Sequence, residues 1–297
     1  MRKVIERIQR HKELLNRGAY LKGAALGTIG FCIRSAVGSD GLRPQWLEVT
    51  EIDLHLHNLH SGLHGLRIAH ISDLHHSRTV SSEYLRRCIE RVNLLDVDIV
   101  LLTGDYITYD IQGRYRKSVV ALLGGIQSRF ATFACLGNHD YGLRALHGRR
   151  RDSLLRRLIQ GMEDNGITVL RNESTLLNIN GSALCFVGLG DLRVGDFHPQ
   201  RAFADVPDGQ AAIVLVHNPR GVEYLGAFPA NAVVSGHTHG AKARLPAVHR
   251  FNTTNARRFH AGLYHVKGTK LYVNRGLGRV GRLRFNARPE ITVFTLC

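Results

Sequence analysis

Short apolar runs recur along this chain, and two stretches between them have helical character. Five of the runs are rich in Val, Ile, Leu or Ala and have the length of buried strands: residues 66–72, 97–103, 131–136, 211–216 and 232–235. Helical character covers residues 81–95, with Ser81 as the expected N-cap, and residues 153–165. The strands expected in a second sheet are residues 167–170, 176–179, 184–189, 271–273 and 291–296. This pattern predicts an α/β protein.

Each of the first five runs ends in residues that can bind a metal ion or transfer a proton. These blocks are Asp73-Leu74-His75, Gly104-Asp105, Gly137-Asn138-His139-Asp140, His217-Asn218 and Gly236-His237-Thr238-His239. Functional groups of open α/β sheets gather beyond the carboxyl ends of the strands, so the five blocks can meet at one place.

The ligand types in these blocks indicate a metal site for hard or borderline divalent ions. The candidates are Asp73, His75, Asp105, Asn138, His217, His237 and His239. Carboxylate, imidazole and amide groups without thiolate suit manganese, iron or zinc. Seven ligands exceed the need of one ion, so we expect two ions that share Asp105 at a spacing of roughly 3.5–4 Å. Two divalent ions carry four positive charges, and the carboxylates of Asp73 and Asp105 neutralise two of them. The remaining positive charge favours an anionic phosphoester substrate.

Each block has a simpler explanation when it is taken alone. The chain has 17 histidines, and a single one such as His55 is most often a surface residue. Asn138 after Gly137 is also consistent with a turn, and His217-Asn218-Pro219 with the end of a strand. The ordered set of five blocks favours the metal site.

The five blocks, in their order along the chain, resemble the signature of the calcineurin-like metallophosphoesterase superfamily. The resemblance implies a four-layer α/β/β/α sandwich. It implies one ion held by Asp73, His75, Asp105 and His239, and a second held by Asp105, Asn138, His217 and His237. It also implies that His139 lies beside the leaving group, so that His139 and Asp105 are the candidate catalytic residues.

The chain departs from the phosphoprotein phosphatases of this superfamily at one position. Those enzymes have a second Asp three residues after the Gly-Asp block, and it orients the histidine of the Gly-Asn-His block. Thr108 stands at that position here. Asp140 or Asp110 is the candidate substitute that would orient His139. The departure argues against a protein phosphatase.

Three further stretches resemble the branch of the superfamily that contains a UDP-2,3-diacylglucosamine pyrophosphatase of lipid A biosynthesis. They are residues 133–141, 187–191 and 272–278. The resemblance implies hydrolysis of UDP-2,3-diacylglucosamine to UMP and 2,3-diacylglucosamine 1-phosphate, with two divalent ions, expected to be Mn²⁺ with Fe²⁺ or Zn²⁺ as alternatives. Arg275, in the Asn-Arg-Gly-Leu-Gly stretch, is a candidate substrate-binding residue.

The chain is strongly basic, which indicates a polyanionic partner. It has 40 Lys and Arg against 24 Asp and Glu, a formal net charge of +16. The sequence contains no helix-turn-helix signature, aromatic-rich ribonucleoprotein box or cysteine finger, so no specific nucleic-acid partner is expected. An anionic membrane surface and a lipid-linked nucleotide sugar fit this charge better. The sequence leaves the oligomeric state open.

Residues 1–45 are expected to form a basic amphipathic segment at a membrane interface, ahead of a catalytic domain that spans residues 46–297. The uncharged run at residues 23–33 is too short to cross a bilayer, which needs roughly 20 residues. Two alternatives for this segment stay open: a secretory signal, and a helix that packs on its own domain. Five cysteines without C-x-x-C spacing are typical of reduced thiols, which favours a peripheral position on the cytoplasmic face of the inner membrane.

Two insertions, near residues 142–165 and 241–267, are candidates for substrate recognition. The first places Arg144, Arg149 and Arg150 directly after the Gly-Asn-His-Asp block, where guanidinium groups can reach phosphates. Both insertions are equally consistent with solvated basic loops.

Two other functions remain open from the sequence. One is a metal-dependent phosphodiesterase that acts on nucleic acid or a cyclic nucleotide. The other is a non-catalytic, membrane-associated scaffold that retains metal ions.

Overall fold

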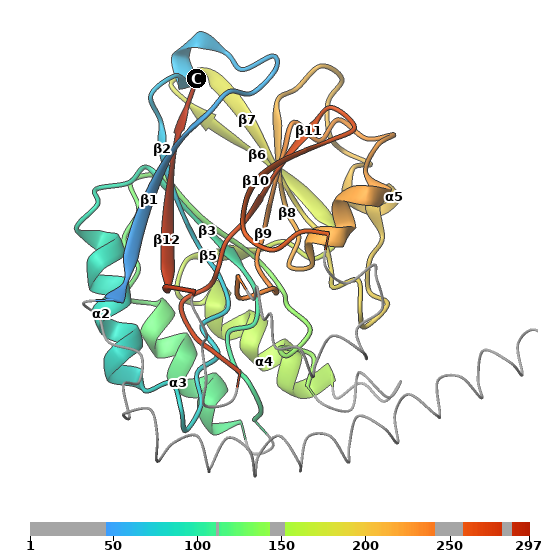
Figure 1. Cartoon of the computed structure of the whole chain (residues 1–297). Coiled ribbons are helices and arrows are strands. Elements are labelled where there is room, and N and C mark those ends of the chain that lie inside the picture. The colour runs from blue at the N-terminus through green and yellow to red at the C-terminus, as the bar shows by residue number, and fades with distance from the viewer. Residues whose placement is uncertain (1–45, 111–112, 143–151, 241–257, 281–286) are drawn as a thin grey trace, which may run out of the picture. The chain divides into compact units, whose positions relative to one another are not determined.

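The computed structural model describes residues 46–110, 113–142, 152–240, 258–280 and 287–297. Figure 1 shows the helices and strands that these residues form; η marks a 3-10 helix. In chain order the elements are β1 (Glu48–Leu54), η2 (Ser61–Leu63), β2 (Arg67–Ile71), α2 (Ser82–Asn93), β3 (Ile99–Thr103), α3 (Arg114–Leu123), β4 (Ala131–Cys135), α4 (Asp152–Glu163), β5 (Ile167–Val169), β6 (Glu173–Ile179), β7 (Ser182–Gly188), α5 (Pro199–Ala202), β8 (Ala212–Leu215), η4 (Pro219–Tyr224), β9 (Ala232–Ser235), β10 (Gly262–Val266), β11 (Thr269–Val273) and β12 (Glu290–Leu296).

The strands form two six-stranded sheets, which confirms the predicted α/β class. The first sheet has the order β1-β12-β2-β3-β4-β5, and the second has the order β10-β11-β9-β8-β7-β6. Strands β2 to β5 are parallel neighbours, as are β7, β8 and β9. Parallel strands buried on both faces explain why their sequences are continuous apolar runs rather than alternating ones.

Side chains of the first sheet alternate between two hydrophobic clusters, as the period of a strand requires. On β3, Val100 and Leu102 pack toward α2, α3 and α4, which cover the outer face of the sheet (Figure 1). Ile99 and Leu101 belong instead to the cluster between the sheets. In that cluster Phe133 of β4 stacks on Phe186 of β7, with ring centroids 4.3 Å apart.

Short helical elements cover the outer face of the second sheet. Val214 of β8 belongs to a third cluster together with Ala202 of α5 and Val222 of η4. The layers are therefore helix, sheet, sheet and helix, as the family resemblance implied. Among the described residues, the fourth layer consists of the short elements α5 and η4.

Helix α2 begins where the sequence predicted. The Ser81 hydroxyl accepts a hydrogen bond from the backbone N–H of Tyr84 at 3.2 Å, which satisfies one free donor of the first turn. The buried face of the helix consists of Tyr84, Leu85, Cys88, Ile89 and Val92. These positions recur at helical spacing and anchor α2 on the first sheet.

Two predicted strands belong to the other sheet than expected. β5 pairs in parallel with β4, after the helix α4 that links them, and β12 pairs with β1 and β2. The prediction that both complete the second sheet was therefore wrong, because an apolar run shows that a strand exists but not which strand it pairs with. The sequence pattern also missed β1, β10 and α3.

Several predictions concern residues outside the described ranges. The basic segment at residues 1–45 and parts of the two insertions, residues 143–151 and 241–257, fall there. In the described ranges, no helix combines the length and the apolar character that a bilayer span requires. The thiols of Cys135 and Cys185 are free and buried, as predicted.

Candidate metal centre

The five polar blocks meet because their strands end at common sheet edges. β2, β3 and β4 are parallel neighbours in the first sheet, and β8 and β9 are parallel neighbours in the second. Hydrogen bonds also join the loops that carry the blocks. The backbone N–H of Asp73 donates to Gly104 O at 3.0 Å, and that of His75 donates to Asp105 O at 2.9 Å. Across the two sheets, the His237 N–H donates to Asp73 Oδ2 at 2.9 Å.

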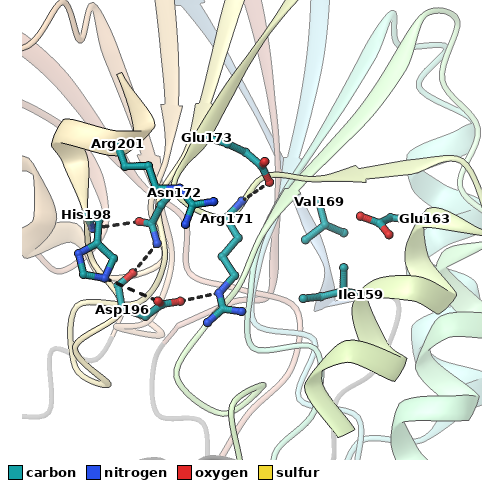
Figure 2. A pocket seen from close by; sticks show the side chains of 9 residues that line it. All are labelled: Ile159, Glu163, Val169, Arg171, Asn172, Glu173, Asp196, His198 and Arg201. Carbon is teal, nitrogen blue, oxygen red and sulfur yellow. Dashed lines mark hydrogen bonds and ion pairs between the residues drawn. The ribbon is translucent and has the colours of Figure 1, made fainter. Parts of the chain in front are cut away.

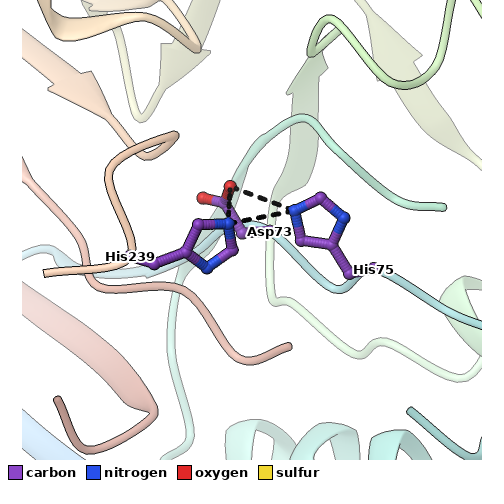
Figure 3. A group of neighbouring side chains, drawn as sticks. All are labelled: Asp73, His75 and His239. Carbon is purple, nitrogen blue, oxygen red and sulfur yellow. Dashed lines mark hydrogen bonds and ion pairs between the residues drawn. The ribbon is translucent and has the colours of Figure 1, made fainter. Parts of the chain in front are cut away.

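One group of candidate ligands consists of Asp73, His75 and His239, which face one another in Figure 3. Asp73 Oδ1 lies 3.6 Å from His75 Nε2 and 3.4 Å from His239 Nε2. The two imidazole nitrogens are 3.1 Å apart. Three ligand atoms thus converge on one point from residues that are far apart in the sequence.

A second group consists of Asp105, His217 and His237. Asp105 Oδ2 lies 3.1 Å from His217 Nε2, and His217 Nε2 lies 3.0 Å from His237 Nδ1. The same Asp105 oxygen is 3.5 Å from His75 Nε2, in the first group. Asp105 therefore stands between the two groups, where a shared ligand is expected.

The separations within the two groups have the size expected for atoms that share a metal ion. Ligand bonds of about 2.1 Å at right angles or at tetrahedral angles put neighbouring ligand atoms about 3.0–3.4 Å apart. The two imidazole–imidazole contacts, at 3.1 Å and 3.0 Å, fall in this range. Two imidazole nitrogens that face each other gain little unless a proton or a cation lies between them.

Burial of polar atoms supports the same assignment. Asp73, His75 and His217 are 0% exposed, and Asp105 and Asn138 are 2% exposed. Asp73 Oδ1 and Asn138 Oδ1 have no hydrogen-bond partner among the described residues. Buried oxygens without a partner cost free energy, and a bound cation removes that cost. The residues therefore fit divalent metal ions; the donor set alone does not identify the metal.

The backbone at the centre adopts a conformation that L-residues seldom take. Asp73, His75, Asp105, His237 and His239 have φ of 51°, 48°, 55°, 71° and 54°. A non-glycine residue in this left-handed region costs about 1–3 kcal/mol and is retained mainly at functional sites. The strained turns direct the side chains of successive blocks toward the same point.

Two glycines permit the loops to approach closely. A Cβ atom on Gly137 would clash with Asp105 Oδ1 and with the Asp105 backbone nitrogen, and one on Gly236 would clash with Ser72 Oγ and Asp73 Oδ2. These contacts explain the glycines in the Gly-Asn-His and Gly-His-Thr-His blocks, because any side chain would displace a candidate ligand.

Charges at the centre are strongly coupled. Burial alone would lower the pKa of His217, but the Asp105 carboxylate outweighs burial and raises this pKa to about 10. Burial alone would raise the pKa of Asp105, but His217 and the other imidazoles hold it well below its usual range. Burial lowers the pKa of His237 to about 3, and the nearby positive charge of His217 adds to this effect. The carboxylates are thus ionised, which is the form that binds a cation.

His139 lies beside Asp105 and is held by the backbone. Its N–H donates to Asp105 Oδ1 at 2.8 Å, and its Nδ1 lies 2.7 Å from the carbonyl oxygen of Thr108. Its ring contacts those of His75 and Tyr109, with centroids 5.0 Å and 5.3 Å away. A carbonyl accepts only, so Nδ1 carries the proton and Nε2 is left for chemistry.

The expectation that Asp140 or Asp110 orients His139 was wrong. Asp140 accepts hydrogen bonds from the backbone N–H groups of Asp105, Tyr106 and Gly137. Asp110 accepts from the backbone N–H of Arg116 and lies near its guanidinium. Within the described residues, the backbone carbonyl of Thr108 orients His139 instead.

Of the four arginines predicted to bind substrate, the structure describes one. Arg144, Arg149 and Arg150 lie outside the described residues. Arg275 Nε donates to Glu290 at 2.9 Å, and its Nη2 donates to Glu48 at 2.7 Å, so its guanidinium connects β1 and β12. Substrate contact by Arg275 stays a prediction, and the structure gives this residue a clear structural role.

A cavity of about 360 Å³ is lined by residues of α4, β5, β6 and α5 and of the segments between them (Figure 2). Arg171 Nε and the Tyr141 hydroxyl both donate to Asp196 Oδ2, each at 2.6 Å. None of the residues that line the cavity is a candidate ligand; they are Ile159, Glu163, Val169, Arg171, Asn172, Glu173, Asp196, His198 and Arg201.

Comparisons with known proteins agree with this geometry. The family model of the calcineurin-like phosphoesterases matches residues 66–241, which contain all five blocks. The "Uncharacterized metallophosphoesterase YkuE" of Bacillus subtilis is 32% identical over 289 residues, which cover 95% of this chain and 98% of that protein.

Two further relatives carry names that state an activity. "UDP-2,3-diacylglucosamine pyrophosphatase LpxG" of Chlamydia muridarum is 30% identical over 304 residues, covering 86% of this chain and 91% of the relative. "Phosphodiesterase YaeI" of Escherichia coli is 32% identical over 232 residues, covering 77% and 82%. The family model matches more than half of the chain, and the structure brings the candidate ligands together in groups. The chain therefore belongs to the calcineurin-like phosphoesterase family and is a hydrolase.

Proposed function

We propose that this protein uses two divalent metal ions to hydrolyse the pyrophosphate bond of UDP-2,3-diacylglucosamine. Water would add to one phosphorus, the bridging P–O bond would break, and the products would be UMP and 2,3-diacylglucosamine 1-phosphate. The observation that carries the hydrolytic chemistry is the pair of ligand groups joined through Asp105. The choice of substrate rests on the Chlamydia relative, with which the alignment covers most of both chains.

The proposed ligand sets divide the seven residues between two ions. Asp73, His75, Asp105 and His239 would hold one, and Asp105, Asn138, His217 and His237 would hold the other. When bound, such a pair of ions polarises a phosphoryl group and activates the attacking water. The nitrogen and oxygen donors suit Mn²⁺, Fe²⁺ or Zn²⁺, and we favour Mn²⁺.

His139 would act on the leaving group. Its Nδ1–H is used by the Thr108 carbonyl, so Nε2 is the atom that would bond the departing oxygen. The short bond from its backbone N–H to Asp105 keeps this imidazole next to the reacting phosphate. Asp105 would thus bind both ions and hold His139 in position.

The charge of the chain supports an anionic, membrane-associated substrate. A net charge of +16 attracts both a diphosphate and an anionic lipid surface. We place the protein peripherally on the cytoplasmic face of the inner membrane, where seven basic residues among the first 22 would bind lipid head groups.

A phosphodiesterase of broader specificity is the second candidate function. The Escherichia coli relative named as a phosphodiesterase favours it, since its identity to this chain is similar to that of the pyrophosphatase. Both functions use the same centre. They differ in whether a diphosphate that carries a lipid is required.

The test is incubation of the purified full chain with Mn²⁺ and radiolabelled UDP-2,3-diacylglucosamine, followed by chromatography for UMP. Parallel reactions contain bis(p-nitrophenyl) phosphate, a cyclic nucleotide and single-stranded RNA. Asp105→Asn, which removes the shared carboxylate charge, is the inactive control for all four.

Release of UMP by the wild type, but not by Asp105→Asn, supports the proposal. Turnover of a simple phosphodiester without UMP release would replace it with the second candidate. Absence of metal-dependent turnover on all four substrates would contradict both functions.

A further inference from the structure

The loop that follows β7 lies at the same sheet edge as the second ligand group. β7 and β8 are parallel, with Gly188 opposite Leu215, and the Leu189 N–H donates to Leu215 O at 3.0 Å. Two residues after Leu215 comes His217, while two residues after Leu189 comes Asp191. The Gly190-Asp191-Leu192-Arg193 stretch is therefore a sixth strand end beside the metal centre.

Asp191 fixes the shape of this loop. It is 0% exposed, and its Oδ1 accepts from the backbone N–H groups of Arg193 at 2.8 Å and Val194 at 3.1 Å. Its Oδ2 is buried and has no hydrogen-bond partner within the described ranges. Two backbone bonds to one carboxylate oxygen hold the main chain of Arg193 in place.

The side chain of Arg193 is exposed and available. In the part of the chain that the structure describes, its guanidinium makes no hydrogen bond and no ion pair. Other arginines near the centre differ from it. Arg171 is paired with Asp196, Arg275 with Glu48 and Glu290, and Arg116 with Asp110.

The same loop also contacts the Gly-Asn-His-Asp block of the first sheet. The backbone N–H of Asp191 donates to the Tyr141 hydroxyl at 3.5 Å, and Tyr141 comes two residues after His139. The loop is therefore hydrogen-bonded both to the strand that leads to His217 and to the residue that follows His139 and Asp140. Arg193, two residues after Asp191, thus stands at the rim of the centre.

We propose that Arg193 binds a phosphate oxygen of the substrate, and that Asp191 is the positioning residue that holds it at the rim of the centre. The inference rests on the proposed phosphoester or phosphoanhydride substrate. A planar guanidinium can offer two parallel N–H donors to a phosphate, which fixes its orientation as well as its position. A guanidinium without a carboxylate partner is free for this contact.

The test measures binding of inorganic phosphate to Mn²⁺-loaded protein by isothermal titration calorimetry, and KM for bis(p-nitrophenyl) phosphate. The variants are Arg193→Gln, Arg193→Lys and the matched control Arg201→Gln. Arg201 is an exposed arginine of α5 in the same β7–β8 connection, and it lines the cavity of Figure 2, which contains no candidate ligand. Thermal unfolding of each variant is the control that checks whether it is folded.

We expect Arg193→Gln to weaken phosphate binding and raise KM by about tenfold, the size of one charge-assisted hydrogen bond. Arg193→Lys should recover part of the loss, and Arg201→Gln should match the wild type. Unchanged binding in Arg193→Gln overturns the inference. An equal loss in Arg201→Gln does the same, because it would reflect only general surface charge.

This outcome can be separated from failure of the proposed function. Phosphate binding needs no turnover, so a wild type that binds phosphate through Arg193 but hydrolyses no tested substrate would contradict the function alone. A wild type that hydrolyses them, with Arg193→Gln unchanged, would contradict only the role of Arg193.

Discussion

His139 Nδ1 lies 2.7 Å from the backbone carbonyl oxygen of Thr108, so a main-chain atom holds the imidazole that the sequence predicts to be catalytic. The Thr108 side chain has a different contact. Its Oγ1 is 3.2 Å from Nδ1 of His75, a candidate ligand. One residue therefore orients two imidazoles through two different groups.

This division predicts opposite effects for two substitutions. Thr108→Val keeps the carbonyl but removes the hydroxyl behind His75, so we expect about tenfold weaker metal binding with kcat retained at saturating Mn²⁺. His139→Gln should lower kcat by about 100-fold while metal binding stays normal. Calorimetric metal titrations and steady-state kinetics check both. A large kcat loss in Thr108→Val at saturating Mn²⁺ would show that the hydroxyl also orients His139.

Asp105 is expected to be indispensable for both ions, because its carboxylate lies within 3.5 Å of a nitrogen in each ligand group. Asp105→Asn should lose most bound metal, whereas Asp73→Asn should mainly lose one of the two ions. Elemental analysis of protein reconstituted with Mn²⁺ and then desalted gives the count. Asp208→Asn, at an exposed position, is the control that should keep the wild-type content. Two ions retained in Asp105→Asn would contradict the shared-ligand assignment.

The His217–Asp105 pair predicts a pH dependence of stability in the metal-free protein. Asp105 raises the pKa of His217 from 6.5 to about 10, despite burial. A pKa raised by folding gives stability that is fully present below pH 6.5 and is lost as pH rises through about 10. The unfolding temperature of chelator-treated wild type should thus fall relative to His217→Asn between pH 7 and pH 10. A constant difference between the two proteins across this window would rule the coupling out.

The same pair predicts proton release when metal binds. Only neutral imidazole is a ligand, so at pH 8 binding should release about one proton from His217. Calorimetric titrations in buffers of different ionisation enthalpy count this proton. His217→Asn should release fewer protons than the wild type.

Gly236→Ala is expected to damage the centre by steric overlap alone. The added Cβ would clash with Ser72 Oγ and Asp73 Oδ2, and relieving the clash should cost about 1–3 kcal/mol of unfolding free energy and displace Asp73. Gly226→Ala is the matched control, because its Cβ would meet only Lys267 Cδ at 3.6 Å. Denaturant unfolding and metal titration should separate the two variants. Tight metal binding in Gly236→Ala would show that the loop can move aside.

The sequence could indicate side chains that the structure brings together, because each block is a local signal. A buried strand followed at once by Asp, Asn or His is visible without knowing the fold, and parallel pairing then brings such ends together. The pattern could not show which sheet receives β5 or β12, since apolar runs do not encode their partners. Nor could it show that Asp140 accepts the backbone N–H groups of Asp105 and Tyr106, or that the Asp191 loop meets Tyr141. Both depend on contacts between residues far apart in the chain.

The ligands come from both sheets, and neither sheet alone carries a complete set. Asp73, His75, Asp105 and Asn138 follow strands of the first sheet, whereas His217, His237 and His239 follow strands of the second. Each proposed ion takes donors from both halves of the sandwich. A fragment that ends before β8 would therefore lose affinity for both ions, and recovery of tight binding on mixing two complementary fragments would report their correct reassembly.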